Sequence, residues 1–171
     1  MEDKINKIKL ILMDVDGVLT DGGIILGTQG IEVKIFNVQD GAGITMARRV
    51  GLKVGILTGR TSEAVSRRAE ELHFDIVSQG HFNKLNAYTQ IKKQTRLADE
   101  EIAYIGDDIL DLPVLRQVGY SVAVNNARSE VKQAVDYITS ASGGKGAVRE
   151  VIDLILKAQN KWQLALEKMI Q

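Results

Sequence analysis

The sequence predicts an α/β fold, a doubly wound parallel sheet with helices on both faces. Four short apolar runs lack polar alternation, which is typical of strands buried on both sides of a parallel sheet: residues 8–13, 53–58, 102–106 and 120–124. Longer segments at helical spacing separate these runs, and repeated strand–helix units wind into such a sheet by right-handed crossovers. Ligands then bind at the carboxyl ends of the strands.

Helices are expected between the apolar runs and after them. Residues 43–51 form one that ends at Gly51, and residues 62–73 and 84–96 form two more, the last capped by Asn83. Pro113 lies in the first turn of another. From Gly146 onward apolar residues recur on one face, which predicts a single long packing helix.

One segment, about residues 22–37, interrupts this alternation. It has two apolar stretches around the turn GTQG, and its second half alternates apolar with polar side chains: Ile31, Glu32, Val33, Lys34 and Ile35. This pattern predicts a β-hairpin insertion. An exposed apolar arm would be prone to aggregate. We therefore expect a neighbouring subunit to cover it, with packing on its own sheet as the alternative.

The composition limits the class of protein. The chain has 171 residues, enough for one domain, which we expect to span residues 1–171. Basic and acidic residues balance at 22 each, so no overall charge attracts nucleic acid or an anionic membrane. The chain has no cysteine and shows no signal peptide or long apolar run. We expect a cytoplasmic protein with a small-molecule partner and with no nucleic-acid or membrane partner.

Polar residues follow the predicted strands at one edge of the sheet. Asp14 and Asp16 follow the first run, Thr58 ends the second, Lys84 opens a helix, and GDDILD at 106–111 follows the third. Carboxylates there can hold Mg²⁺ and attack phosphorus, while a lysine and a hydroxyl stabilise phosphoryl oxygens. Close aspartates repel one another without a cation. The sequence therefore predicts a divalent metal site and phosphoryl transfer.

Taken singly, these residues have plainer interpretations. The two aspartates alone could form a turn, Thr58 could be a helix-terminal polar residue, and Lys84 could be solvated. An EF-hand calcium loop is disfavoured because Val18 stands at its third ligand position. The SGGKG segment lacks the spacing of a phosphate loop, and neither histidine has metal-ligand spacing.

The order DxDGV, threonine, lysine and GDDxxD, from Asp14 to Asp111, resembles the haloacid dehalogenase superfamily of Mg²⁺-dependent phosphotransferases. The resemblance implies that Asp14 is the nucleophile that forms an aspartyl-phosphate. Asp16 would protonate the leaving alcohol and then activate water. Thr58 and Lys84 would bind the transferring phosphoryl group.

The same resemblance implies a set of metal ligands. Mg²⁺ would be held by Asp14, the backbone carbonyl of Asp16, and Asp107, with Asp108 or Asp111 in an outer shell. The gaps between the motifs are too short for the cap domain that many members insert. The implied enzyme is capless, and its active site is open unless a neighbouring subunit closes it.

Segments along nearly the whole chain are similar to the capless 3-deoxy-D-manno-octulosonate 8-phosphate phosphatases of lipopolysaccharide biosynthesis: DGVLTDGGI, FNVQDGAGI, LTGR, QGHFNK, GDDILDLPV and GGKGAVREV. In that family hairpins assemble at the centre of a homotetramer and a neighbour completes each site. The resemblance implies these substrate-binding residues: Asp16, Asn37, Val38, Gln39, Asp40, Gly41, Thr45, Arg60, Arg68 and Lys84. Guanidinium groups such as those of Arg60 and Arg68 pair bidentately with carboxylate or phosphate.

Three points stay open at this stage. Thr45 stands where the family often has a basic residue, which leaves sugar preference there undecided. Within the carboxyl-terminal lid and helix region of about residues 140–171, the segment SGGKGAV resembles a mobile lid with Lys145 as its closing contact, or it is only a loop before the last helix. Two other functions remain: a phosphatase for a nonulosonate 9-phosphate, and a phospho-accepting signalling domain. The signalling domain is disfavoured because it lacks a second aspartate two residues after the first.

Overall fold

The computed structural model describes residues 2–170, which contain a six-stranded parallel sheet in the order β5-β4-β1-β6-β7-β8. The strands are β1 (Leu10–Met13), β4 (Lys53–Leu57), β5 (Ile76–Ser78), β6 (Ile102–Gly106), β7 (Tyr120–Ala123) and β8 (Tyr137–Ile138). The strand order reverses beside β1, because β4 lies on one side of it and β6 on the other. Such a switch point forms a crevice at the carboxyl ends of the strands.

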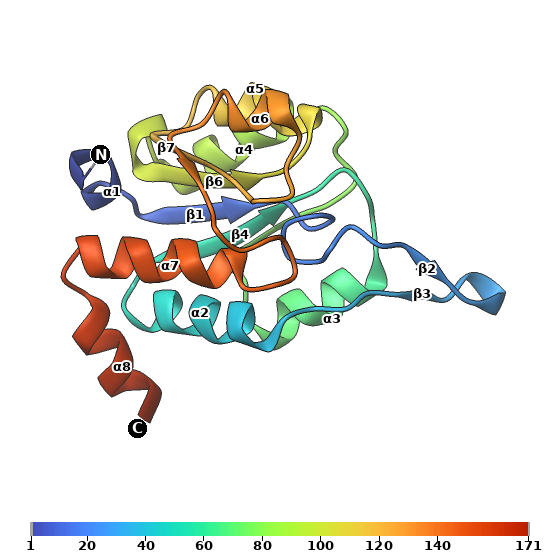
Figure 1. Cartoon of the computed structure of the whole chain (residues 1–171), viewed down its shortest axis with the longest axis horizontal. Helices are drawn as coiled ribbons and strands as arrows, with labels where there is room; N and C mark the ends of the chain where they lie inside the picture. Colours follow the sequence, from blue (N-terminus) through green and yellow to red (C-terminus); the bar gives the residue numbers. More distant parts are fainter. Residues whose placement is uncertain (1, 171) are drawn as a thin grey trace.

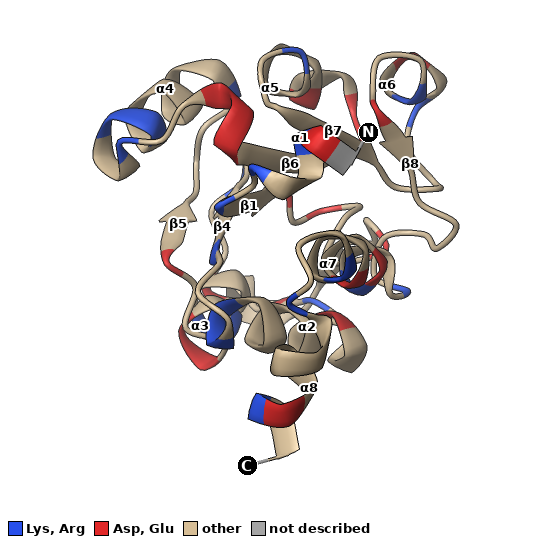
Figure 2. Cartoon of the chain, turned by 90° about the vertical axis from the view of Figure 1, so that its left-hand side faces the viewer, with Lys and Arg blue, Asp and Glu red and all other residues tan. Residues whose placement is uncertain are grey.

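Helices cover both faces of the sheet, with α4, α5 and α6 on one side and α2, α3 and α7 on the other (Figure 2). Their bounds are α2 (Val38–Arg49), α3 (Glu63–Glu71), α4 (Lys84–Thr95), α5 (Leu112–Leu115), α6 (Ser129–Lys132) and α7 (Ala147–Ala158). Two further helices are α1 (Glu2–Asn6) and α8 (Trp162–Ile170). The predicted doubly wound α/β fold is confirmed. Within residues 2–170, the helices are all too short or too polar to cross a membrane.

Local sequence explains where the helices begin. The Asn83 side chain accepts a hydrogen bond from the backbone N–H of Asn86, and so caps α4 as predicted. Asn37 caps α2 in the same way. Pro113 occupies the first turn of α5, where its missing N–H costs no helical hydrogen bond.

The predicted hairpin is formed by β2 (Ile25–Leu26) and β3 (Glu32–Val33), and it projects from the body of the molecule (Figure 1). It is the insertion between β1 and α2, and residues 2–170 contain no cap domain. Its apolar side chains are exposed: Ile24, Ile25, Leu26, Ile31, Val33 and Ile35. The alternative that they pack on their own sheet is therefore wrong.

The carboxyl-terminal prediction of one long helix is also wrong. Helix α7 ends at Ala158, and Asn160 adopts a left-handed backbone conformation with φ of 54°. That residue redirects the chain, so α8 starts at Trp162 and packs against α2, where Ala165 is buried. The two edge strands β5 and β8 were not predicted, because each has only three or two residues.

Candidate active site

The site lies where β1, β4 and β6 end. Met13 pairs with Ile56 on one side and with Ile105 on the other. Thr58 and Asp107 each follow those partners by two residues, so the parallel register brings both to the level of the turn that contains Asp14 and Asp16. Asp14 and Thr58 are both buried, and the Asp14 backbone N–H donates to the carbonyl of Ile105.

Lys84 brings a buried positive charge into this edge of the sheet. It is the first residue of α4, and its Nζ lies 2.7 Å from Asp14 Oδ2 and 2.6 Å from Asp111 Oδ1. The fully buried Asp111 carboxylate also accepts from the Tyr104 hydroxyl at 2.6 Å and from the Asp107 backbone N–H at 2.9 Å. Burying a charge is costly unless it is paired. This network therefore fixes Lys84 against the predicted nucleophile.

The carboxylates of this cluster have unusual proton affinities. Burial raises the pKa of Asp14 to about 6, with Asp111 acting in the same direction and Lys84 against it. Burial, followed by the charges of Asp111 and Asp14, raises the pKa of Asp107 to about 8. Burial alone would lower the pKa of Lys84, but its two carboxylate partners outweigh this effect and raise it. One ammonium thus faces three carboxylates.

The same carboxylates fit a divalent metal. Oxygens of Asp14, Asp107 and Asp111 lie within 4.8 Å of one another. Asp107 Oδ1 is buried and has no hydrogen-bond partner among the described residues. Hard cations such as Mg²⁺ take oxygen ligands, and a cation relieves the repulsion between these carboxylates. Asp111 is the least suited of the three, because its Oδ1 accepts from both Lys84 and Tyr104 and its Oδ2 accepts from the backbone N–H groups of Asp107 and Asp108. Asp14 and Asp107 are therefore the better ligands.

Asp111 and Asp108 differ clearly in their surroundings. Asp111 is fully buried and holds Lys84, whereas Asp108 is exposed and its carboxylate accepts from the Ile109 backbone N–H. Of the two residues expected in an outer shell, only Asp111 thus lies among the clustered carboxylates. The backbone carbonyl of Asp16 as a ligand stays a prediction.

Asp16 points toward the hairpin and the α3 side of the site. Its Oδ1 pairs with Lys34 Nζ, and its Oδ2 lies 3.6 Å from Arg60 Nε. Arg60 also pairs with Glu32 at 2.8 Å. The hairpin therefore contributes charged side chains to the site, which the sequence reasoning did not assign.

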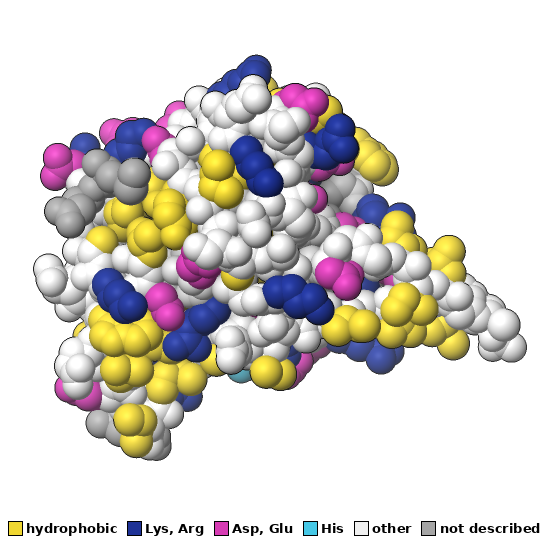
Figure 3. Space-filling view, viewed as in Figure 1, with side chains coloured by type: hydrophobic (Ala, Val, Ile, Leu, Met, Phe, Trp, Pro, Cys, Tyr) yellow, Lys and Arg dark blue, Asp and Glu magenta, His cyan; other side chains and the backbone are white. Residues whose placement is uncertain are grey.

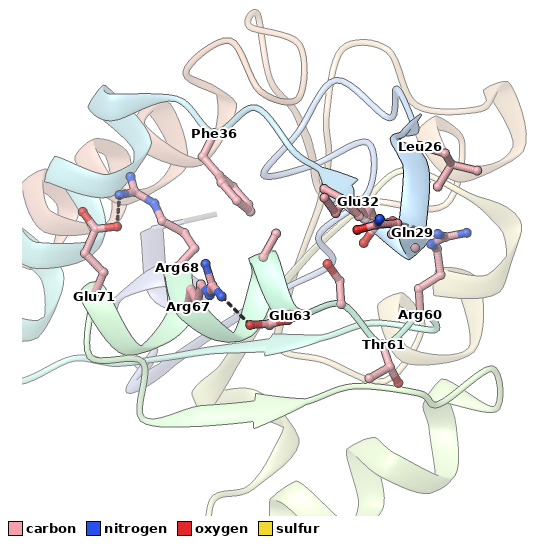
Figure 4. Close-up of a pocket in the computed structure, with 14 residues that line it drawn as sticks. Leu26, Gln29, Glu32, Phe36, Arg60, Thr61, Glu63, Arg67, Arg68 and Glu71 are labelled. Atoms are coloured by element: carbon pink, nitrogen blue, oxygen red, sulfur yellow. Dashed lines mark hydrogen bonds and ion pairs between the residues drawn. The ribbon is translucent and has the colours of Figure 1, made fainter.

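A cavity of about 910 Å³ adjoins Asp16 between the hairpin and α3, lined by Arg60, Arg68, Glu32 and Phe36 among others (Figure 4). Arg68 pairs with Glu71 at 2.9 Å and lies 5.8 Å from the centre of the Phe36 ring. Both predicted anion-binding arginines thus border one cavity. The clustered aspartates are not among the described residues that line this cavity.

The predicted substrate segment at residues 37–41 begins α2. Asn37 Nδ2 donates to the carbonyl of Gly144, so this segment meets the glycine-rich loop at residues 142–146. Asp40, predicted with the rest of this segment to contact substrate, has a buried carboxylate that accepts from the Arg149 backbone N–H at the start of α7. Substrate contact by this segment stays a prediction. The Thr45 hydroxyl donates to the carbonyl of Gly41 within α2. Val38 is exposed, and Gln39 lies on the same first turn of α2.

The glycine-rich loop packs directly on the turn after Asp16. Gly144 N–H donates to the carbonyl of Val18, and a Cβ on Gly143 would lie 1.7 Å from the carbonyl oxygen of Gly17. Only glycine permits so close an approach at this position. Lys145, the expected closing contact, is exposed. Lid motion stays a prediction.

Comparison with known proteins identifies the family. The profile of haloacid dehalogenase-like hydrolases matches residues 68–152. The 3-deoxy-D-manno-octulosonate 8-phosphate phosphatase KdsC of Escherichia coli K12 is 46% identical over 158 residues, covering 92% of this chain and 84% of that protein. The chain belongs to the KdsC family of haloacid dehalogenase-like hydrolases. The resemblance read from the motifs is confirmed at this level.

Solved structures of the KdsC family have the same fold. The Moraxella catarrhalis enzyme, in complex with magnesium, phosphate and KDO, superposes with a TM-score of 0.95 at 43% identity and covers 98% of this chain and 97% of its own. The cobalt-bound Haemophilus influenzae enzyme superposes with a TM-score of 0.91 at 42% identity, and the match covers 94% of each chain. Two relatives thus contain a divalent metal.

Three residues of this site were not predicted from the sequence: Tyr104, Glu32 and Lys34. Tyr104 lies inside a buried apolar strand, so only its hydroxyl marked it as polar. Glu32 and Lys34 alternate with apolar residues, and that alternation was the available signal. The alternation predicts a strand with one apolar face and one charged face, but it does not predict which face lies toward the site.

Proposed function

We propose that this protein is a Mg²⁺-dependent phosphatase that hydrolyses 3-deoxy-D-manno-octulosonate 8-phosphate to 3-deoxy-D-manno-octulosonate and phosphate. The observation that carries the proposal is the buried contact of 2.7 Å between Lys84 Nζ and Asp14 Oδ2. It joins a carboxylate nucleophile to a cation that can hold the transferring phosphoryl group. Relatives of 43% and 46% identity with this stated activity support the choice of substrate.

The proposed reaction has two steps. The Asp14 carboxylate attacks phosphorus, the bond between phosphorus and the sugar oxygen breaks, and Asp16 gives that oxygen a proton. Water then attacks the aspartyl-phosphate while Asp16 accepts its proton. The bond between phosphorus and Asp14 breaks, which releases phosphate and restores both carboxyl groups.

Charge stabilisation comes from groups that surround the nucleophile. Lys84 and Thr58 would hold the phosphoryl oxygens, and the buried Asp111 keeps Lys84 in place at 2.6 Å. Mg²⁺ would be held by Asp14, the Asp16 carbonyl and Asp107, and when bound it supplies positive charge that offsets repulsion between phosphoryl and carboxylate oxygens.

The cavity between the hairpin and α3 would bind the acidic sugar. Arg60 and Arg68 border it and can pair with the carboxylate of the sugar acid. Asn37 and the rest of residues 37–41 lie at the start of α2, next to the glycine-rich loop. The phosphate of a sugar acid, which carries a carboxylate as well, fits this arrangement better than the phosphate of a neutral hexose.

We also propose that the chain forms a homotetramer in which neighbouring subunits cover the hairpin. Apolar side chains gather along the projecting arm (Figure 3). Leu26 on β2 is 73% exposed and Ile35 after β3 is 66% exposed. Exposed apolar groups on a strand pair favour association. Leu26→Asp should shift the mass measured by light scattering from tetramer to smaller species, and an unchanged mass would contradict this interface.

A phosphate-release assay tests the function. Wild-type protein is compared with Asp14→Asn on phosphates of eight-carbon and nine-carbon sugar acids and on a hexose phosphate, with Mg²⁺ or EDTA. The eight-carbon substrate should give the highest kcat/KM, and EDTA and Asp14→Asn should abolish release. Preference for the nine-carbon substrate would overturn the substrate assignment. A long-lived phosphoprotein after acetyl phosphate would indicate a signalling domain instead.

A further inference from the structure

The hairpin has an inverted pattern of burial. Its apolar residues Val33 and Ile35 are exposed, whereas the side chain of Glu32 is 15% exposed and that of Lys34 only 1%. A strand that packs on its own domain normally turns its apolar side inward. Here the inward side carries charge and faces the carboxyl ends of the strands. This indicates a role for the charged side at the site itself.

Four charged side chains form a closed group at this point. Lys34 Nζ pairs with Asp16 Oδ1 and lies 3.5 Å from Glu32 Oε1. Arg60 then bridges the same two carboxylates, at 2.8 Å from Glu32 and 3.6 Å from Asp16. A buried ammonium is costly without a carboxylate partner, so Lys34 stays with Asp16 and Glu32.

This group restricts the carboxylate of Asp16. A general acid or base must hold its oxygen about 2.6–3.2 Å from the atom that exchanges the proton. Asp16 lies in a turn beyond β1, and its two oxygens contact different cations, Lys34 and Arg60. Arg60 lines the cavity and is exposed to an incoming anion, while Lys34 is buried. Lys34 is thus the partner whose position does not depend on substrate.

We propose that Lys34 is a positioning residue for the phosphatase reaction: held by Glu32, its ammonium orients the Asp16 carboxylate toward the leaving oxygen. The inference rests on the proposed function for the role of Asp16. It also connects the hairpin to catalysis, because Lys34 directly follows β3. A hairpin that is displaced from the body would leave Asp16 without this partner.

The first test compares three variants with the wild type. Lys34→Met removes the ammonium and keeps the apolar stem, Lys34→Arg keeps the charge, and Lys53→Met is the matched control on an exposed lysine that starts β4. Lys34→Met should lower kcat between about tenfold and a hundredfold, below the contribution of about 10²–10⁴ typical of general acid–base catalysis. KM should change less than about twofold, Lys34→Arg should recover part of kcat, and Lys53→Met should match the wild type.

The second test asks whether Lys34 acts through Asp16. The loss in kcat/KM, which reports the first phosphoryl transfer, should be larger for a simple sugar phosphate than for p-nitrophenyl phosphate, whose leaving group needs no proton. In an Asp16→Asn background, Lys34→Met should change the rate by less than about twofold, because coupled residues are not additive. Glu32→Gln should show a smaller loss with the same dependence on leaving group, and it carries the test if Lys34→Met does not fold.

Equal losses on both substrates, a full further loss in the Asp16→Asn background, or no recovery by Lys34→Arg would each overturn the proposal. Neither substrate in this comparison is the octulosonate phosphate. Failure of the wild type on that compound would therefore refute the proposed substrate and leave the result on Lys34 intact.

Discussion

Gly17→Ala should strain the backbone and also disturb the metal site. Gly51→Ala should strain the backbone alone, so it is the control that separates the two effects. Gly17 has φ of +91° and Gly51 has φ of +86°. An L-residue in a left-handed conformation costs about 1–2 kcal/mol. At about 2–4 °C per kcal/mol for a chain of this size, both variants should lose about 2–8 °C in Tm. Strain alone thus predicts similar losses.

The surroundings of the two glycines differ. A Cβ on Gly17 would lie 2.1 Å from Asp107 Oδ2, whereas a Cβ on Gly51 would meet nothing within 4 Å. Asp107 would have to turn away from the cluster that it forms with Asp14 and Asp111. Only Gly17→Ala should therefore weaken metal binding. It should also lose activity, while Gly51→Ala keeps it.

Thermal unfolding with EDTA and with Mg²⁺ measures this difference. A ligand at 100 times its Kd stabilises the folded state by about 2.7 kcal/mol, which corresponds to about 5–11 °C here. Wild type and Gly51→Ala should show this gain in Tm, and Gly17→Ala should lose most of it. Equal gains in all three proteins, with equal phosphate release, would refute the placement of the metal beside Asp107.

Three further predictions follow from the buried charges. Lys84→Met leaves Asp14 and Asp111 without their cation, so the free energy of unfolding in urea should fall by about 3–5 kcal/mol, and phosphate release should be lost; an unchanged urea midpoint would contradict the buried pair. Burial raises the pKa of Asp107 to about 8 in the folded chain, whereas an aspartate in the unfolded chain has a pKa of about 3.9. The folded state therefore holds the extra proton, and stability in EDTA should fall as pH rises from 4 to 8. Asp107→Asn should flatten that slope, and an identical slope would count against the raised pKa. Asp40→Ala should cost about 0.5–2 kcal/mol as a lost helix cap, with kcat within about twofold of wild type; a large loss of kcat at unchanged stability would instead support substrate contact through the Asp40 side chain.

The central fold could be predicted because buried parallel strands are continuous apolar runs. Residues 10–13 and 102–106 are buried at every position. In the sequence both runs lack charged residues and polar alternation, which is the pattern expected of such strands. The edge strands β5 and β8 could not be predicted in the same way, because so few residues leave no pattern. The break before α8 depends on the left-handed Asn160, which a run of apolar residues on one helix face does not reveal.

The site was partly predictable for a similar reason. Asp14, Thr58 and Lys84 follow strands or open a helix, so topology alone directs them to one edge of the sheet. Tyr104 and Asp40 gave no such signal, because neither follows a strand at that edge of the sheet. Tyr104 reaches the site from within a strand, and Asp40 turns to α7 because the unpaired N–H groups of that helix start attract a carboxylate.

Lys34 shows why the sequence did not predict which face of the hairpin is buried. Alternation with a period of two gives a strand two faces, and hydrophobicity normally decides which face is buried. That rule fails when another chain covers the apolar face, as we propose for the hairpin, and when a charge partner lies on the opposite one. The partner of Lys34 is Asp16, 18 residues earlier in the sequence. The burial of Lys34 is therefore decided by the fold that brings the hairpin back over the end of β1.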